Sequence, residues 1–217
     1  MASDRGRSDV RSRASGKSCK TRKAIMRAYL ELLETKEFDK IRVADIIRHL
    51  DIARSTFYAY FDDAYDVIGT IEDEFLDEMP SPDKNEADNR LRECGEASLE
   101  KRCAQADWYR EWLDYIVEHK RILAALTGHH GNPQFAHKLR SRVRELWRMQ
   151  LNSDGFYGDL EEQNFFLRMI SDTQLRCVKD LVKESADEAY LKKHYAYLMY
   201  VLRLGAWYDR VSWGRSC

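Results

Sequence analysis

The strongest pattern in this chain of 217 residues is carried by residues 41–61, which read Ile41-Arg42-Val43-Ala44-Asp45-Ile46-Ile47-Arg48-His49-Leu50-Asp51-Ile52-Ala53-Arg54-Ser55-Thr56-Phe57-Tyr58-Ala59-Tyr60-Phe61. One apolar helix face, spaced i, i+3, i+4, i+7 over about two turns, is formed by Val43, Ile46, Ile47 and Leu50. The spacing breaks after Leu50, and a second short helix is expected from Ser55 to Phe61. Two short helices joined by a tight turn are typical of a helix-turn-helix unit.

In such a unit the first short helix braces against the DNA backbone, and the second enters the major groove. A longer helix is expected before the unit from Lys20, and another after it, ending at Pro80. Phe57 and Phe61, four residues apart, are expected to face the core. The remaining side chains of the second short helix suit contacts with phosphates and base edges, and they are Arg54, Ser55, Thr56, Tyr58 and Tyr60.

This run resembles the signature of the TetR family of transcriptional regulators. The shared features are the apolar start, Asp-Ile in the first short helix, and Thr-Phe-Tyr-x-Tyr-Phe in the second. The resemblance extends over roughly fifty residues, and residues 112–139 resemble a C-terminal domain common in that family, as does Gly205 with Trp213. It implies that Arg54, Ser55 and Thr56 lie at the groove and that Tyr58 and Tyr60 bind phosphates.

Three positions depart from the family pattern. Arg42 stands where a capping threonine is usual, and its guanidinium is expected to reach a phosphate instead. Ala53 replaces a serine-type cap of the groove-entering helix. Ala64 replaces a lysine that commonly contacts the DNA backbone, and it stands among Asp62, Asp63 and Asp66, which repel phosphate.

The rest of the chain predicts an all-α protein, because it has only three prolines and long stretches rich in helix-forming residues. We expect a flexible basic arm at residues 1–19, a helix-turn-helix domain at 20–66, and a C-terminal helical regulatory and dimerisation domain at 67–217. Residues 1–60 hold 14 Lys and Arg against 8 Asp and Glu. The excess of acidic residues follows after residue 60, which is the charge distribution expected of a protein that touches phosphate with one end.

The C-terminal part is rich in aromatic residues, most of which are expected to form its core. As a set they also suggest a ligand pocket, lined by Trp108, Trp112, Tyr115, Phe135, Trp147 and Phe166. The last two helices, around 165–182 and 191–213, have broad apolar faces that we expect one chain to leave partly uncovered, which favours a homodimer.

Other classes of function find little support in the sequence. His129, His130 and His137 lack a carboxylate or cysteine at metal-ligand spacing, so no metal or cofactor is expected. The five cysteines are odd in number and scattered, and free thiols are favoured over a redox switch between Cys94 and Cys103. No common catalytic motif is present, and neither a signal peptide nor a membrane-spanning run is found, so we expect a cytoplasmic protein that is not an enzyme.

The resemblance implies a transcriptional regulator, a repressor by preference, that binds a palindromic double-stranded operator as a homodimer through its last two helices. A small-molecule effector in the C-terminal domain would release it. The alternative is a protein of the same fold that has lost DNA binding and acts through protein contacts. Ala64 and its acidic neighbours favour this alternative.

Overall fold

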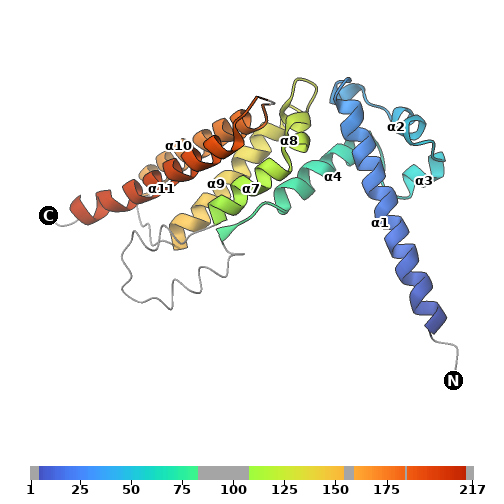
Figure 1. Cartoon of the computed structure of the whole chain (residues 1–217), viewed down its shortest axis with the longest axis horizontal. Helices are drawn as coiled ribbons and strands as arrows, with labels where there is room; N and C mark the ends of the chain where they lie inside the picture. The colour runs from blue at the N-terminus through green and yellow to red at the C-terminus, as the bar shows by residue number, and fades with distance from the viewer. Residues whose placement is uncertain (1–4, 83–107, 154–158, 184, 214–217) are drawn as a thin grey trace. The chain divides into compact units, whose positions relative to one another are not determined.

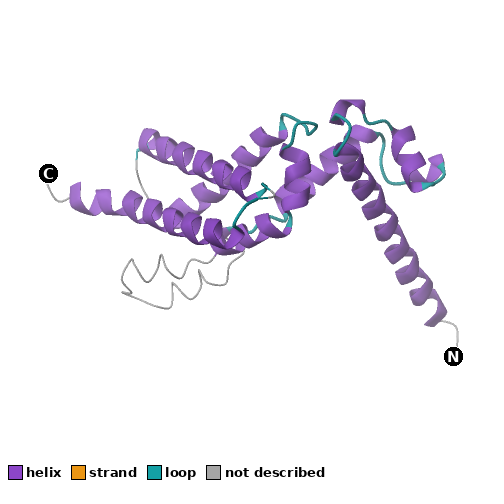
Figure 2. Ribbon diagram, turned by 45° about the horizontal axis from the view of Figure 1, so that its top comes forward, coloured by secondary structure: helices purple, strands orange, loops and turns teal. Residues whose placement is uncertain are grey.

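The computed structural model describes residues 5–82, 108–153, 159–183 and 185–213. Every regular element in these ranges is helical, as Figure 2 shows, which confirms the all-α prediction. The helices are α1 (Arg5–Leu33), the 3-10 helix η1 (Phe38–Lys40), α2 (Val43–Leu50), α3 (Arg54–Tyr58), α4 (Ala64–Asp77), α7 (Trp108–Glu118), α8 (Lys120–Thr127), α9 (Phe135–Ser153), α10 (Leu160–Leu181) and α11 (Glu188–Trp213). Figure 1 labels them along the chain, except for η1.

The chain divides into two compact units. The head unit comprises residues 1–75 together with 125–132, and the body unit comprises residues 76–124 and 133–217. The head therefore reaches further along α4 than the expected boundary at residue 66, because Val67, Ile68 and Ile71 are buried. It also takes in a short segment from far along the sequence.

Helix α1 begins much earlier than the sequence suggests. The composition of residues 1–19 predicts a flexible arm, whereas the structure continues α1 back to Arg5. Residues 5–19 contain no proline, and helix propagation costs little once a turn is formed. The packed part of α1, where Ile25 and Tyr29 are fully buried, supplies that turn.

The head core joins α1 to α4. The Arg22 guanidinium pairs with the Glu74 carboxylate and also lies 5.6 Å from the centroid of the Phe61 ring. Tyr29 donates its hydroxyl hydrogen to the Phe38 carbonyl at 3.1 Å. These contacts fix α1 as the support on which α2 packs.

Residues 125–132, at the end of α8 and the turn that follows, complete the head. The His130 carbonyl accepts a 2.8 Å hydrogen bond from the Phe38 amide. Asn132 donates its side-chain amide to the Glu72 carboxylate at 2.9 Å, and Glu72 is almost fully buried. A glycine is required at position 131, because a Cβ there would lie 2.2 Å from the Leu126 carbonyl oxygen.

The body unit is a helical bundle in which α10 packs against both α9 and α11, and α7 packs against α11. Trp112, Phe135 and Trp147 are fully buried in it. The structure divides residues 108–127 at His119 into two helices, α7 and α8. The Tyr115 carbonyl accepts both the His119 ring Nδ1 at 2.9 Å and the His119 amide at 3.0 Å, so the break between the helices is confined to one residue.

Asp180 ties α10 to α11 and makes the body sensitive to acid. Its carboxylate accepts hydrogen bonds from Tyr195 at 2.8 Å and Lys183 at 2.7 Å, which lower its pKa from 3.8 to about 2, with the Lys183 bond the larger cause. Because this pKa is lower in the folded chain, the stabilisation is present above about pH 4 and is lost as the pH falls toward 2.

Asp180→Asn is therefore expected to destabilise the body by about 1 kcal/mol at pH 7. The difference from wild type should shrink as the pH falls from 4 toward 2. Urea unfolding followed by tryptophan fluorescence at several pH values measures it. A difference that stays constant over this range would contradict the ionised role of Asp180.

Candidate nucleic-acid interface

The turn between α2 and α3 is built by Asp51, which adopts the left-handed conformation with φ 50° and ψ 50°. Its backbone amide donates to the Ile47 carbonyl, and the Ile52 amide donates to the same carbonyl at 3.2 Å. Aspartate tolerates this conformation better than most residues with a side chain. The predicted helix-turn-helix is thus confirmed in its geometry, with α3 shorter than expected and ending at Tyr58.

The α3 helix is held on the head by its apolar face. Phe57 is fully buried and Phe61 nearly so, as the spacing predicts. Their rings lie 6.1 Å apart between centroids. Because this face points inward, the opposite side of α3 remains open to solvent.

Arg54 and Tyr58 form a pair on that open side. Arg54 donates a hydrogen bond to the Tyr58 hydroxyl at 3.2 Å, and its guanidinium carbon lies 5.4 Å from the centroid of the Tyr58 ring. Tyr58 remains 45% exposed. The ring and hydroxyl together hold the guanidinium in place. Because the Arg54 side chain is already ordered, it loses less conformational entropy when it binds a base or a phosphate.

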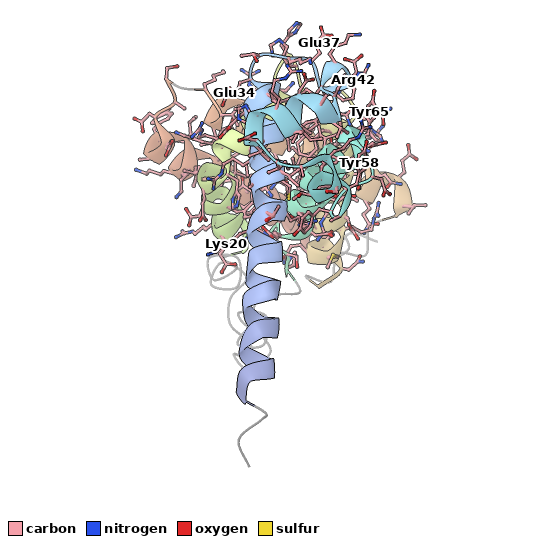
Figure 3. All side chains as sticks on the ribbon, turned by 90° about the vertical axis from the view of Figure 1, so that its right-hand side faces the viewer. Lys20, Glu34, Glu37, Arg42, Tyr58 and Tyr65 are labelled. Carbon is pink, nitrogen blue, oxygen red and sulfur yellow. The ribbon has the colours of Figure 1, made fainter. Side chains whose placement is uncertain are left out.

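Arg42 stands at the N-cap of α2, exposed, and Figure 3 shows it on the same side of α1 as Tyr58. Its side chain makes no cap hydrogen bond, since a guanidinium has no acceptor. The Arg42 amide instead donates to the Asp45 carboxylate at 2.9 Å. The Lys36 ammonium pairs with the same carboxylate, and these bonds lower the pKa of Asp45, with that to Lys36 the largest cause.

The other predicted contact residues differ in exposure. Ser55 is exposed, whereas Thr56 and Tyr60 are half-buried. The structure therefore brings Arg54, Ser55 and Tyr58 to the solvent side of α3 and leaves Thr56 and Tyr60 partly covered. Arg48 and Lys20, which the sequence analysis did not select, are also exposed in the head unit.

The aspartates at the start of α4 have a structural explanation. Asp63 accepts the Asp66 amide at 2.8 Å, and Asp66 accepts the Asp62 amide at 3.0 Å, so these carboxylates cap the helix. Acidic groups near a helix N-terminus also interact favourably with its dipole. Ala64 is buried, which leaves the usual lysine contact with DNA without a counterpart at this position.

Ala53 is the N-cap of α3 and provides no side-chain hydrogen bond. Ala53→Ser is expected to stabilise the head by about 1 kcal/mol, because a hydroxyl at this position satisfies a free helix amide. Urea unfolding followed by far-UV circular dichroism measures the gain. Ala44→Ser, at an exposed position inside α2, is the matched control and should be slightly destabilising. Equal effects of the two substitutions would show that capping is not the cause.

The aromatic residues suggested as a ligand pocket lie mainly in the body core. Trp112, Phe135 and Trp147 are fully buried, Tyr115 is buried and Phe166 half-buried. The side chain of Trp108 is outside the described part of the structure. No residue of this set lines the hollow described for the body, which lies between α9 and α10 and is surrounded largely by arginines.

These arginines, Arg144, Arg148 and Arg168, were not selected from the sequence. The spacing of Arg140, Arg144 and Arg148 at i, i+4 and i+8 was a visible signal that one helix face is basic. Arg168 joins them only through the packing of α10 on α9.

Three further expectations concern metals, thiols and membranes. Within the described residues, no group of three histidine, cysteine or acidic side chains is arranged to hold a metal ion. Cys19 and Cys177 are free thiols, and burial raises the pKa of Cys177 to about 12, whereas Cys94 and Cys103 lie outside the described residues. None of the described helices combines the length and apolar character needed to cross a bilayer.

The comparisons with known proteins rest on structure. No family model matches the sequence, and no curated protein matches it significantly. The dihydroxyacetone kinase operon activator DhaS is similar, with 18% identity, a TM-score of 0.56, and coverage of 86% of this chain and 96% of that one. A TetR transcriptional regulator from Streptococcus agalactiae 2603V is similar at 19% identity and a TM-score of 0.56, over 88% and 98% of the two chains. The resemblance seen in residues 41–61 is thus confirmed at the level of architecture, and the chain has the fold of TetR transcriptional regulators.

Proposed function

We propose that this chain is a DNA-binding transcriptional regulator whose head reads the major groove with α3. The observation that carries the proposal is the Arg54–Tyr58 pair, which stands exposed on a helix whose other face is anchored by Phe57. Arginine is the side chain most often used to contact guanine in the major groove. Arg42 and Tyr58 would contact phosphates, which position the head without reading sequence.

The similar solved proteins support the same function, since their names describe a transcriptional regulator and an operon activator. The excess of basic residues in the N-terminal stretch 1–60, 14 Lys and Arg against 8 Asp and Glu, agrees with it. We favour repression as the mode of action, by which a bound dimer would occupy its operator.

Selection of bound DNA from a random library, followed by footprinting, tests this function. The expected result is a palindrome whose half-sites lie about one helical turn, or roughly 34 Å, apart. Affinity for the recovered site should fall steeply as salt rises, because bound phosphates release counterions. Absence of any enriched sequence would contradict the proposal.

A homodimer through α10 and α11 is part of the proposal. Large apolar side chains are exposed on these helices in one chain, which is where a second chain would cover them. On α11 they follow the spacing of one helix face. The set comprises Phe165 and Met169 of α10, with Tyr190, Tyr197, Leu198 and Val201 of α11.

Tyr197→Glu combined with Phe165→Glu is expected to give a monomer in sedimentation velocity, because a buried unpaired charge costs several kcal/mol. These residues are 67% and 57% exposed in the single chain, so the folded monomer itself should tolerate both changes. The control is Tyr65→Glu, at an exposed position in the head, which should leave the dimer intact. A double variant that remains dimeric would place the interface elsewhere.

An effector that releases DNA would bind in the body. Two buried donors, Trp112 Nε1 and Gln174 Nε2, have no acceptor within the described residues, so a ligand with an acceptor group would satisfy them. Such a ligand needs a differential affinity of only about 2.7 kcal/mol to weaken DNA binding a hundredfold.

The alternative is a protein of this fold that acts through protein contacts. It is favoured by the absence of a lysine at position 64 and by the three exposed aspartates around it. The capping hydrogen bonds of Asp63 and Asp66 give these acids a role within the head that is compatible with either function. The salt series separates the two, since a protein that has lost DNA binding gives no salt-dependent complex.

A further inference from the structure

An open hollow of about 560 Å³ lies between α9 and α10 of the body unit. This volume is within the range of small-molecule sites. Its lining combines two leucines with a group of polar and charged side chains, namely Leu160, Leu167, Arg144, Arg148, Arg168, Glu161 and Asn164. The hollow therefore offers an apolar surface beside a concentration of positive charge.

Among the described residues that line this hollow, positive charge exceeds negative charge. Three guanidinium groups meet a single carboxylate, that of Glu161. Within the described residues, none of these arginines forms an ion pair with a carboxylate. Like charges gathered around one hollow raise its electrostatic energy, and a bound anion would lower it.

Arg140, one helical turn before Arg144 on α9, shows how a charge on α9 can be paired by α10. The Arg140 Nε lies 3.2 Å from the Asp172 carboxylate of α10. One turn further along α9 stands Arg144, and one turn back along α10 from Asp172 stands Arg168. Arg140 thus has an acidic residue, Asp172, opposite it on α10, whereas the corresponding residue near Arg144 is a second arginine, Arg168.

Arg144 is held in place by the wall of the hollow. Its Nε donates to the Ser171 hydroxyl at 3.3 Å, and Ser171 is fully buried. The Ser171 hydroxyl in turn donates to the Arg168 carbonyl at 3.0 Å. This chain fixes the guanidinium and leaves its two terminal amino groups, which match the two oxygens of a carboxylate or phosphate.

We propose that this hollow binds a small organic anion carrying phosphate or carboxylate groups. Arg144, Arg148 and Arg168 would hold the anionic groups, and Leu160 and Leu167 would cover part of the carbon skeleton. Asn164 would donate or accept hydrogen bonds, and Glu161 would accept them, at hydroxyl or amino groups of the same ligand. The site lies wholly in the body unit, so the proposal does not depend on whether the head binds DNA.

Isothermal titration calorimetry on the full chain tests the site, with inorganic pyrophosphate in one arm and citrate in the other, at an ionic strength held constant with chloride. Saturable binding of one anion per chain is expected in at least one arm, and the arm that binds tells phosphate from carboxylate. Arg148→Ala with Arg168→Ala should weaken this binding at least tenfold, because two charge-assisted contacts are lost. Arg168→Lys, which keeps the charge but not the planar fork, should fall between the double variant and wild type.

Arg176→Ala is the matched control, because it removes an arginine that already has a partner, Asp180, on the same helix. It should bind the probe like wild type. Arg168→Glu supplies the missing carboxylate and should abolish binding while keeping or raising the melting temperature without ligand. The proposal is overturned if neither anion binds saturably, or if Arg176→Ala weakens binding as much as the double variant does.

Discussion

Arg54→Ala is expected to weaken binding to the selected operator by about 2–6 kcal/mol, or roughly 30-fold to 10⁴-fold. Each of two heads would lose a base contact worth about 1–3 kcal/mol. Fluorescence anisotropy with a labelled operator at fixed salt measures the loss. Because Arg54 is exposed on α3, the thermal stability of the chain should change little.

Variants of Tyr58 separate the support of Arg54 from direct contact with DNA. Tyr58→Phe keeps the ring beneath the guanidinium but removes the hydroxyl to which Arg54 donates. Its operator affinity should therefore fall less than that of Arg54→Ala. Tyr58→Ala removes both and should approach Arg54→Ala. The control Arg176→Ala removes the same charge from the body. If Arg54→Ala weakened operator and random DNA equally, Arg54 would be a phosphate ligand and not a base reader.

Phe57→Ala is expected to destabilise the head unit by about 3–5 kcal/mol, because it empties the space of a fully buried ring. The two units can be followed separately. All five tryptophans, at positions 108, 112, 147, 207 and 213, belong to the body unit. In urea, far-UV circular dichroism should therefore show an early transition for the head, while the tryptophan fluorescence transition stays at its wild-type position.

Tyr58→Ala serves as the control for Phe57→Ala, since the adjacent side chain is 45% exposed and its loss should cost much less stability. A fluorescence transition that moves together with the circular dichroism transition would mean that head and body unfold as one cooperative unit. A small effect of Phe57→Ala on both signals would mean that α3 is not anchored by this ring.

The helix-turn-helix could be predicted from the sequence because its signals are local. The apolar spacing of α2 and the four-residue step from Phe57 to Phe61 fix which faces are buried. The missing cap at Ala53 was also visible, because capping depends on a single side chain. The extension of α1 back to Arg5 was missed, since composition alone does not say how far a packed helix propagates.

Features that depend on tertiary packing could not be predicted. The hydrogen bond from Asn132 to Glu72 joins residues sixty positions apart, and no local pattern relates them. The basic hollow needs Arg168 to meet Arg144 and Arg148 across two helices, which depends on the register of α9 against α10. Aromatic composition likewise does not distinguish core from pocket, and Trp112 and Trp147 are fully buried.

The short segment 125–132 has a consequence for recombination. The head is not a continuous stretch of chain, because Leu126 is buried within it and Asn132 donates to its buried Glu72. A chimera that joins residues 1–75 to the body of another regulator would lose these contacts and expose the apolar surface that Leu126 covers. Exchange of heads between proteins of this fold therefore requires that two segments be transferred together, residues 1–75 and residues 125–132.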